Sequence, residues 1–184
     1  MKIALGADHR GTDVLRQLSA LLAQKEQLHP YTCSRCAGDA IDYTDMAVPV
    51  CVAVANGHAD RGILICATGL GSSITANKIR GIRAALVHDE LGAEMARRCL
   101  DANVLCLAAD LVGPRVMERI VDTFLSAEFE GGRHRRRLQK LQRVEAGDLD
   151  GYSAEAAASG SGSNSDSNSD SPRPHPVPSA STAP

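Results

Sequence analysis

The chain has few of the side chains that proteins use to stack on nucleotide bases. Its 184 residues include no tryptophan, two phenylalanines and three tyrosines. Basic residues do gather in RHRRRLQKLQR, but lysine and arginine together number 20 against 22 aspartates and glutamates, a formal net charge of −2. Proteins that bind single-stranded nucleic acid combine a basic surface with aromatic platforms. The composition therefore predicts no nucleic-acid partner.

Long apolar runs are also missing. No stretch approaches the roughly 18 consecutive apolar residues of a membrane-spanning helix. The amino-terminal segment MKIALGA is followed by Asp8 and His9, too soon for a signal peptide. We therefore expect a cytoplasmic protein without a membrane partner.

The six cysteines do not form the pattern of a disulfide framework or of a metal site. Most lie inside apolar stretches, where a reduced cysteine behaves as a small hydrophobic residue. They occupy positions 33, 36, 51, 66, 99 and 106. The CSRC segment has metal-binding spacing, but one such pair supplies only two of the four ligands that a structural zinc needs. We expect neither a disulfide nor a metal.

Short apolar runs alternate with segments of helical periodicity, which is typical of parallel strands joined by crossover helices. We expect an α/β fold, a three-layer αβα sandwich with a five-stranded parallel Rossmann-like sheet. The expected strands cover residues 3–7, 28–32, 62–66, 84–87 and 104–108. The expected helices cover residues 14–22, 47–54, 90–99, 114–127 and 133–145. A further helix is expected from about residue 73, with Ser72 or Ser73 as its cap.

The composition changes near residue 148. From residue 159 the chain reads SGSGSNSDSNSDSPRPHPVPSASTAP, which is rich in Ser, Gly, Pro and Asp and almost free of large apolar residues. Such a segment cannot bury enough apolar surface to offset the entropy of ordering it. We predict one domain over residues 1–147 and a disordered tail over residues 148–184.

Two polar clusters follow predicted strands, at the edge where open parallel sheets bind their ligands. GADH places Asp8 and His9 after the first strand, and CATGLGSS places Cys66 after the third. In isolation, Asp8 and His9 are equally well explained as loop residues, and Cys66 as a buried structural thiol. The glycine spacing fits neither the dinucleotide fingerprint nor the phosphate loop that ends in GK[ST]. Because both clusters can converge on one crevice, together they indicate a site for an anion.

Five segments occur in the order and at about the spacing found in one group of isomerases. They are MKIALGADHRG, DYTDMA, GILICATGLGSSITANKIRGIRAALVHD, DANVL and FEGGRHRRRL. Over residues 1–146 the chain thus resembles the sugar-phosphate isomerases that include type B ribose-5-phosphate isomerase and galactose-6-phosphate isomerase. The resemblance implies an aldose–ketose isomerase that interconverts ribose 5-phosphate and ribulose 5-phosphate through an enediolate. It implies no metal or organic cofactor, and a homodimer or dimer of dimers with shared active sites.

The resemblance also assigns roles to individual residues. Cys66 matches the base that moves a proton between C1 and C2, and Thr68 matches the hydroxyl that assists it. Asp8 and Cys99 complete the predicted catalytic set. The predicted contacts to the sugar and its phosphate are His9, Tyr43, Ala67, Gly69, Leu70, Gly71, Ser73, Asn103, Arg133 and Arg137. Within this set, the amides of residues 67–73 resemble an anion hole, and His9 and the two arginines match phosphate-binding positions. Without the resemblance, the arginines are better explained as part of a solvated basic helix.

Several positions depart from the ribose-phosphate enzymes that the chain resembles. Cys99 and Leu100 replace a histidine that opens the furanose ring and an asparagine that contacts the sugar. Asp110 replaces a phosphate-binding arginine, and would repel a phosphate if it faced the same pocket. Ala67 replaces a glycine, and Ser72 stands where some members have a glutamate base, which leaves Cys66 as the only apparent base.

Three interpretations of these departures are open. The protein is a pentose-phosphate isomerase in which Cys99 or water opens the ring. Alternatively, it isomerises another sugar phosphate, either a hexose 6-phosphate or a tetrose 4-phosphate, whose esterified O4 cannot close a furanose. In the third interpretation it is a non-catalytic or partner-dependent relative. Retention of Asp8, His9, Cys66 and Thr68 favours an enzyme.

Overall fold

The computed structural model describes residues 1–25, 29–32 and 41–149. Residues Met1–Ala146 form one compact unit, and of the second unit, Gly147–Pro184, only residues 147–149 are described. The CSRC segment and most of the predicted tail therefore lie outside the described residues. The boundary at residue 147 and the disorder of the tail stay predictions.

Five parallel strands form the sheet. They are β1 (Lys2–Ala7), β2 (His29–Thr32), β3 (Arg61–Cys66), β4 (Ala84–Leu86) and β5 (Val104–Ala108), and they lie in the order β2-β1-β3-β5-β4. From β1 the chain moves outward to β2, whereas after β3 it builds the other half of the sheet. Strand order thus reverses between β1 and β3. The loops after these two strands border the crevice where such a sheet binds ligands.

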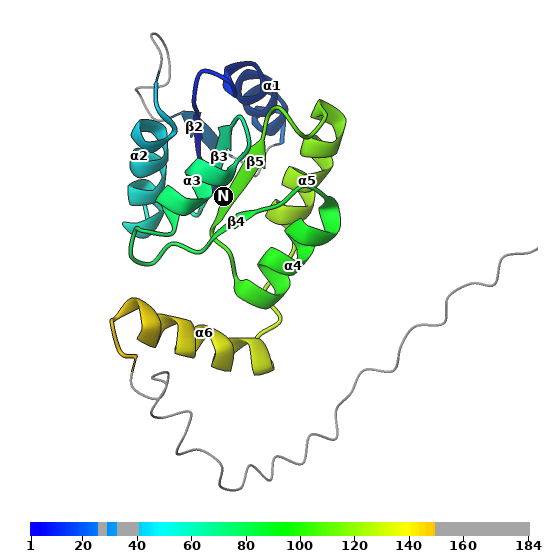
Figure 1. Ribbon diagram of the computed structural model, residues 1–184. Coiled ribbons are helices and arrows are strands. Elements are labelled where there is room, and N and C mark those ends of the chain that lie inside the picture. Colours follow the sequence, from blue (N-terminus) through cyan, green and yellow to red (C-terminus); the bar gives the residue numbers. More distant parts are fainter. Residues whose placement is uncertain (26–28, 33–40, 150–184) are drawn as a thin grey trace, which may run out of the picture. The chain divides into compact units, whose positions relative to one another are not determined.

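Helices cover both faces of the sheet, as Figure 1 shows. One face is covered by α2 (Tyr43–Ala55) and α3 (Leu70–Ala76), and the other by α1 (Thr12–Ala23), α4 (Glu90–Leu100) and α5 (Pro114–Ser126). The last helix, α6 (Gly132–Glu145), lies beside β4 and the end of α4. The predicted α/β class, with a parallel sheet flanked by helices, is confirmed.

Side chains of the central strands alternate between two cores. Ile63 and Ile65 of β3 pack with α1, α4 and α5, whereas Leu64 and Cys66 pack with α2 and α3. All four are buried, because a parallel strand covered on both faces leaves no side for polar residues. Burial of each large aliphatic side chain contributes about 1.5–3 kcal/mol. The loop that follows Cys66 therefore extends from a buried strand that is paired on both sides.

The start of α3 corrects the sequence-based prediction. The helix begins at Leu70 rather than near residue 73, and neither Ser72 nor Ser73 caps it. Its N-cap is Gly69, whose φ of +74° lies in the left-handed region that glycine tolerates. Ser73 instead donates its hydroxyl to the Leu70 carbonyl, and Ser72 is fully buried. The sharp turn at Gly69 shortens the loop and brings the helix close to Cys66.

The described helices contain no segment with the length and apolar character needed to span a bilayer. The location of the protein in the cell stays a prediction.

Candidate active site

Cys66 is the last residue of β3 and only 4% exposed. The Gly69 amide donates a hydrogen bond of 3.1 Å to its sulfur, because the left-handed turn points that N–H back at the strand end. Beside it, the exposed Thr68 accepts a weaker hydrogen bond from the Leu70 amide at 3.4 Å. The loop therefore holds the Cys66 sulfur at the carboxyl edge of the sheet with a backbone amide directed at it.

Two glycines of this loop are required by close packing. A Cβ at Gly69 would lie 2.3 Å from Leu86 Cδ1 of β4. A Cβ at Gly71 would lie 2.8 Å from the ring of Tyr43, the first residue of α2. The predicted contact residues Tyr43, Gly69 and Gly71 thus come together. The half-exposed Tyr43 ring forms one wall beside the loop.

The loop after β1 is tied to the end of β3. The Asp8 amide donates to the Ile65 carbonyl at 3.1 Å. The buried carboxylate of Asp8 accepts hydrogen bonds from the amides of Arg10 and Gly11, at 2.9 and 3.2 Å. Gly11 allows this close approach, since its Cβ would lie 2.7 Å from Ile65. Asp8 and the exposed His9 are thereby held next to the Cys66 loop, as predicted from the strand order of such sheets.

The loop after β5 lies on the other side of Cys66. The Ala109 amide donates to the Cys66 carbonyl at 2.9 Å, and the Asp110 amide to the Ala67 carbonyl at 3.0 Å. The Asp110 carboxylate forms an ion pair at this edge. Its two oxygens accept from Nη2 of Arg10 at 2.9 and 3.0 Å. The repulsion expected from Asp110 is therefore offset by a cation that sequence reasoning missed, although Arg10 directly follows His9.

The described cysteines differ in their surroundings. Burial raises the pKa of Cys106 well above its usual value, with smaller contributions from Cys51 and Cys66. Cys106 is thus held as a thiol inside the sheet, whereas Cys66 lies where the sheet ends. Among the described residues, no three histidine, cysteine, aspartate or glutamate side chains converge as metal ligands would. Nearby, the buried Ser72 hydroxyl has no hydrogen-bond partner among the described residues.

The other predicted site residues lie at the opposite edge of the sheet. Cys66 is paired with Ala108 at the carboxyl end of β5, whereas Cys99 and Asn103 precede Val104, where β5 begins. Four residues of strand separate these edges by roughly 13 Å. The structure therefore brings Asp8, His9, Tyr43, Cys66–Gly71 and Ser73 to one edge and does not bring Cys99, Asn103, Arg133 or Arg137 to it.

The carboxyl end of α4 is fixed by ion pairs. Asp101 adopts a left-handed conformation with φ of +45°, and its carboxylate pairs with Arg83 and Arg97 at 2.8 Å each. The side-chain amide of Asn103 is hydrogen-bonded at both ends. Its Oδ1 accepts from the backbone amide of Arg83, and its Nδ2 donates to the Gly81 carbonyl, each at 2.8 Å. These contacts give Asn103 a structural role within its own chain.

Cys99 and Leu100 are presented by this end of α4. The Cys99 thiol contacts Met95 Sδ at 3.9 Å, and the Leu100 side chain is 52% exposed. Within the described part of the chain, no charged or hydroxyl group hydrogen-bonds to either side chain. Their setting is apolar and open.

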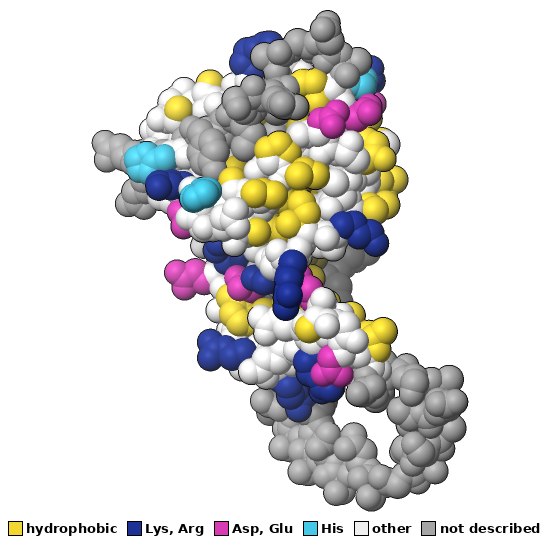
Figure 2. Space-filling view, turned by 90° about the vertical axis from the view of Figure 1, so that its left-hand side faces the viewer, with side chains coloured by type: hydrophobic (Ala, Val, Ile, Leu, Met, Phe, Trp, Pro, Cys, Tyr) yellow, Lys and Arg dark blue, Asp and Glu magenta, His cyan; other side chains and the backbone are white. Residues whose placement is uncertain are grey.

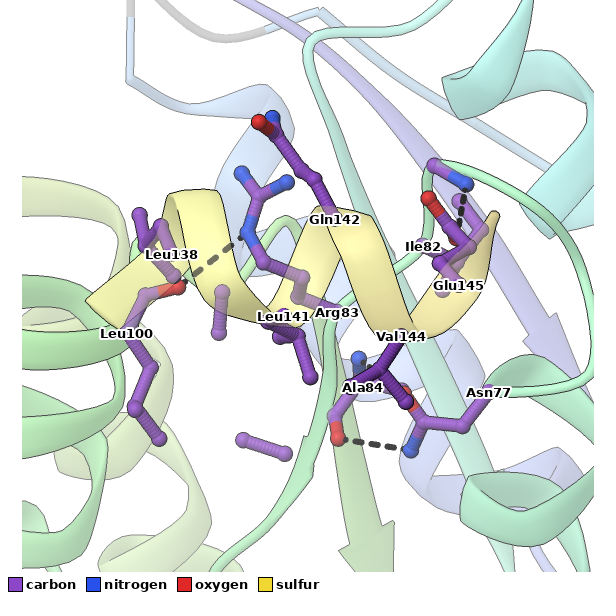
Figure 3. A pocket seen from close by; sticks show the side chains of 13 residues that line it. Asn77, Ile82, Arg83, Ala84, Leu100, Leu138, Leu141, Gln142, Val144 and Glu145 are labelled. Carbon is purple, nitrogen blue, oxygen red and sulfur yellow. Dashed lines mark hydrogen bonds between the residues drawn. The ribbon is translucent and has the colours of Figure 1, made fainter. Parts of the chain in front are cut away.

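A groove of about 400 Å³ separates α6 from β4 and the end of α4 (Figure 3). Leu138, Leu141 and Val144 of α6 line it. Figure 3 also shows Glu145 hydrogen-bonded to the Gly81 amide, at 2.6 Å, which fixes the far end of α6. The exposed Arg133 and Arg137 lie on α6, so they belong to the amino edge of the sheet.

An apolar surface lies beside the Cys66 loop. Figure 2 shows hydrophobic side chains gathered on the side of the body formed by α2 and α3. Its large exposed members are Tyr43, Val48, Val52, Leu70 and Ile74. Apolar surfaces of this kind are typical of contacts with another protein chain.

The fold and these loops define an α/β protein with a parallel sheet flanked by helices, in which the loops after β1, β3 and β5 meet around Cys66. The model of the ribose/galactose isomerase family matches residues 3–141. The chain belongs to this family of isomerases.

Similar proteins carry different substrate names. A putative sugar phosphate isomerase of Bacillus subtilis, YwlF, is 38% identical over 81% of this chain and 100% of its own length. D-erythrulose-4-phosphate isomerase of Pectobacterium atrosepticum is 37% identical over 77% of this chain and 93% of its own. Ribose-5-phosphate isomerase B of Mycoplasma genitalium, solved with bound ribulose 5-phosphate, is 42% identical with a TM-score of 0.75, over 79% of this chain and 96% of its own.

Proposed function

We propose that the protein interconverts ribose 5-phosphate and ribulose 5-phosphate with Cys66 as the base. The thiolate removes the proton from C2 of the aldose, which gives an enediolate, and the thiol returns a proton to C1 while a hydroxyl proton moves from O2 to O1. The observation that carries this proposal is the placement of a buried sulfur at the ligand crevice with an amide donor 3.1 Å away. The Mycoplasma genitalium relative, which was solved with bound ribulose 5-phosphate, supports the substrate.

The neighbours of Cys66 complete the proton-transfer machinery. Thr68 is the group that assists the base, and the backbone of Ala67, Leu70 and Ser73 contributes to an anion hole for the enediolate oxygen. Asp8 holds the β1 loop against β3 and presents His9 to the substrate phosphate. Tyr43 is the wall against which the sugar lies.

A second copy of the chain completes the site in this proposal. Cys99 lies at the amino edge, and Arg133 and Arg137 lie on α6, which packs beside the amino-edge residues at the end of α4. A partner subunit that presents its amino edge to the carboxyl edge of this one would bring the arginines to the phosphate. The exposed apolar side chains of α2 and α3 beside the Cys66 loop offer a surface for that contact. We therefore propose a homodimer with shared sites, which can pair further into a tetramer.

Another substrate is favoured by the surroundings of Cys99. Its thiol contacts the Met95 sulfur, and none of the charged groups among the described residues hydrogen-bonds to it, so it is poorly suited to open a furanose ring. A tetrose 4-phosphate has its O4 esterified and needs no ring opening. The relative named D-erythrulose-4-phosphate isomerase supports this second candidate. A hexose 6-phosphate, and a non-catalytic or partner-dependent role, are the other outcomes of the same test.

The test is an assay of purified full-length protein against pentose 5-phosphates, tetrose 4-phosphates and hexose 6-phosphates. We expect the highest kcat/KM on ribose 5-phosphate. A higher value on a tetrose 4-phosphate, together with a gain on ribose 5-phosphate in the Cys99→His/Leu100→Asn double variant, would replace the first candidate by the second. A folded protein without turnover of any sugar phosphate would favour the non-catalytic or partner-dependent role.

A further inference from the structure

An ion pair joins the two loops that flank the Cys66 loop. Arg10 follows β1 and Asp110 follows β5, and the sheet order places β3 between these strands. Both partners are fixed at the backbone, since the Arg10 amide binds Asp8 and the Asp110 amide binds Ala67. The contact between their side chains is therefore a defined feature of the carboxyl edge.

The pair decides how much positive charge faces the crevice. Arg10 is the neighbour of His9, and it lies on a loop that borders the point where strand order reverses. A guanidinium is a strong partner for a phosphate, since it can donate two parallel hydrogen bonds. In the structure both oxygens of Asp110 already accept from one nitrogen of Arg10, at 2.9 and 3.0 Å. The aspartate thus occupies the position that an anionic group of a ligand would take.

We propose that Asp110 competes with the substrate phosphate for Arg10, and that this pair sets how tightly the site holds a phosphate group. The proposal rests on the proposed function for the identity of the ligand as a sugar phosphate. Arg10 is a specificity-determining residue in this account, and Asp110 lowers its availability.

The exposure of the pair makes this competition feasible. The side chains of Arg10 and Asp110 are 56% and 38% exposed, so water screens their attraction. Exposed ion pairs of this kind contribute about 0.2–1 kcal/mol. A doubly charged phosphate can displace a single carboxylate from such a contact. Loss of the pair should therefore change ligand affinity more than the stability of the fold.

The test measures the affinity of the full-length protein for inorganic phosphate by calorimetry. Asp110→Asn is expected to tighten phosphate binding about two- to five-fold, the factor that corresponds to an exposed ion pair. The same substitution in an Arg10→Gln background is expected to give no gain, since the cation that it would release is gone. Asp110→Ser serves as a second variant with the same expected result.

Asp122→Asn is the matched control. It removes one negative charge and releases Lys25 from an exposed ion pair on α5. The proposal is overturned if Asp110→Asn leaves phosphate affinity unchanged, if the gain persists without Arg10, or if Asp122→Asn gives the same gain. Because the readout is binding, a protein that turns over no sugar phosphate would refute the proposed function and leave this test intact.

Discussion

The two edges of the sheet differ in how their loops are held and in the side chains that they carry. At the carboxyl edge, backbone hydrogen bonds tie the loops after β1 and β5 to the end of β3, and the Gly69 amide contacts the Cys66 sulfur. The amino edge carries charged side chains and the groove beside α6. It carries Arg61, whose pKa is lowered first by burial and then by Arg97, and the exposed arginines of α6.

In the proposed function, one chain therefore contains two half-sites. The carboxyl edge carries Cys66, the proposed base, with an amide donor on its sulfur. The amino edge carries cations and a groove of about 400 Å³. Chemistry is thus expected to depend on the first edge. Most of the phosphate affinity is expected to depend on the arginines of the second edge, and the Arg10–Asp110 pair of the first edge adjusts it.

The largest effect is expected from Cys66→Ser. An alcohol is a far weaker base than a thiolate, so kcat should fall about 10²- to 10⁴-fold while binding of the sugar phosphate survives. Steady-state assays together with calorimetry separate the two quantities. Cys106→Ala is the control, because burial raises the pKa of that thiol and keeps it out of proton transfer. Turnover of Cys66→Ser within a few-fold of the unmodified protein would remove Cys66 from the mechanism.

Substitution of Gly69 tests whether the carboxyl edge is as constrained as it looks. Gly69→Ala should lower the free energy of unfolding by about 1–3 kcal/mol, since its φ of +74° is strained for alanine and its Cβ would collide with Leu86. Gly81→Ala has the same conformational strain, with φ of +82°, but nothing within 4 Å of its Cβ. Urea unfolding should show a larger loss at Gly69. Equal losses of unfolding free energy in the two variants would mean that Leu86 moves aside and that its contact does not constrain the loop.

A purely kinetic effect is expected at the amino edge. Arg133→Gln or Arg137→Gln should raise KM for the sugar phosphate about ten-fold, as loss of a charge-assisted contact would, with little change in melting temperature because both side chains are exposed. Arg136→Gln, exposed on the same helix and outside the predicted set, is the matched control. If KM rises equally in all three variants, α6 contributes only its overall positive charge and Arg133 and Arg137 make no specific contact with the phosphate.

The smallest effect is expected where α6 is anchored. Glu145→Gln weakens the hydrogen bond from the Gly81 amide, and as an exposed contact it should cost less than about 1 kcal/mol. Thermal unfolding measures this change, with Lys140→Gln as the control. A loss of several degrees in melting temperature, or a loss of turnover as large as that of the arginine variants, would show that α6 is held mainly by this contact.

Much of the carboxyl edge was predictable because its signals are local. The apolar runs that end at Ala7 and Cys66 gave the strands, and the rule for parallel sheets placed Asp8 and Cys66 at one crevice. The early start of α3 was missed because it depends on the left-handed turn at Gly69, which forms against Leu86. A glycine alone does not reveal that contact.

Features that depend on distant parts of the chain were not predictable from local patterns. Arg10 and Asp110 are 100 residues apart, so no window of sequence shows that they pair. The separation of Cys99 from Cys66, by contrast, follows from the predicted elements, since Cys99 lies just before a strand begins and Cys66 lies where a strand ends. The family resemblance assigned both cysteines to one site. It did not indicate that, within a single chain, they lie at opposite edges of the sheet.

Mixing of two impaired variants, assayed at a substrate concentration well below the KM of the arginine variant, tests the division between the edges most directly. Cys66→Ser is combined with an Arg133→Gln/Arg137→Gln double variant, and the mixture is exchanged into heterodimers. If each site takes its base from one chain and its arginines from the other, half of the heterodimers' sites are intact, and random exchange should restore roughly one quarter of the unmodified activity. Activity no higher than the average of the two variants assayed separately would contradict the account and place the whole site within one chain.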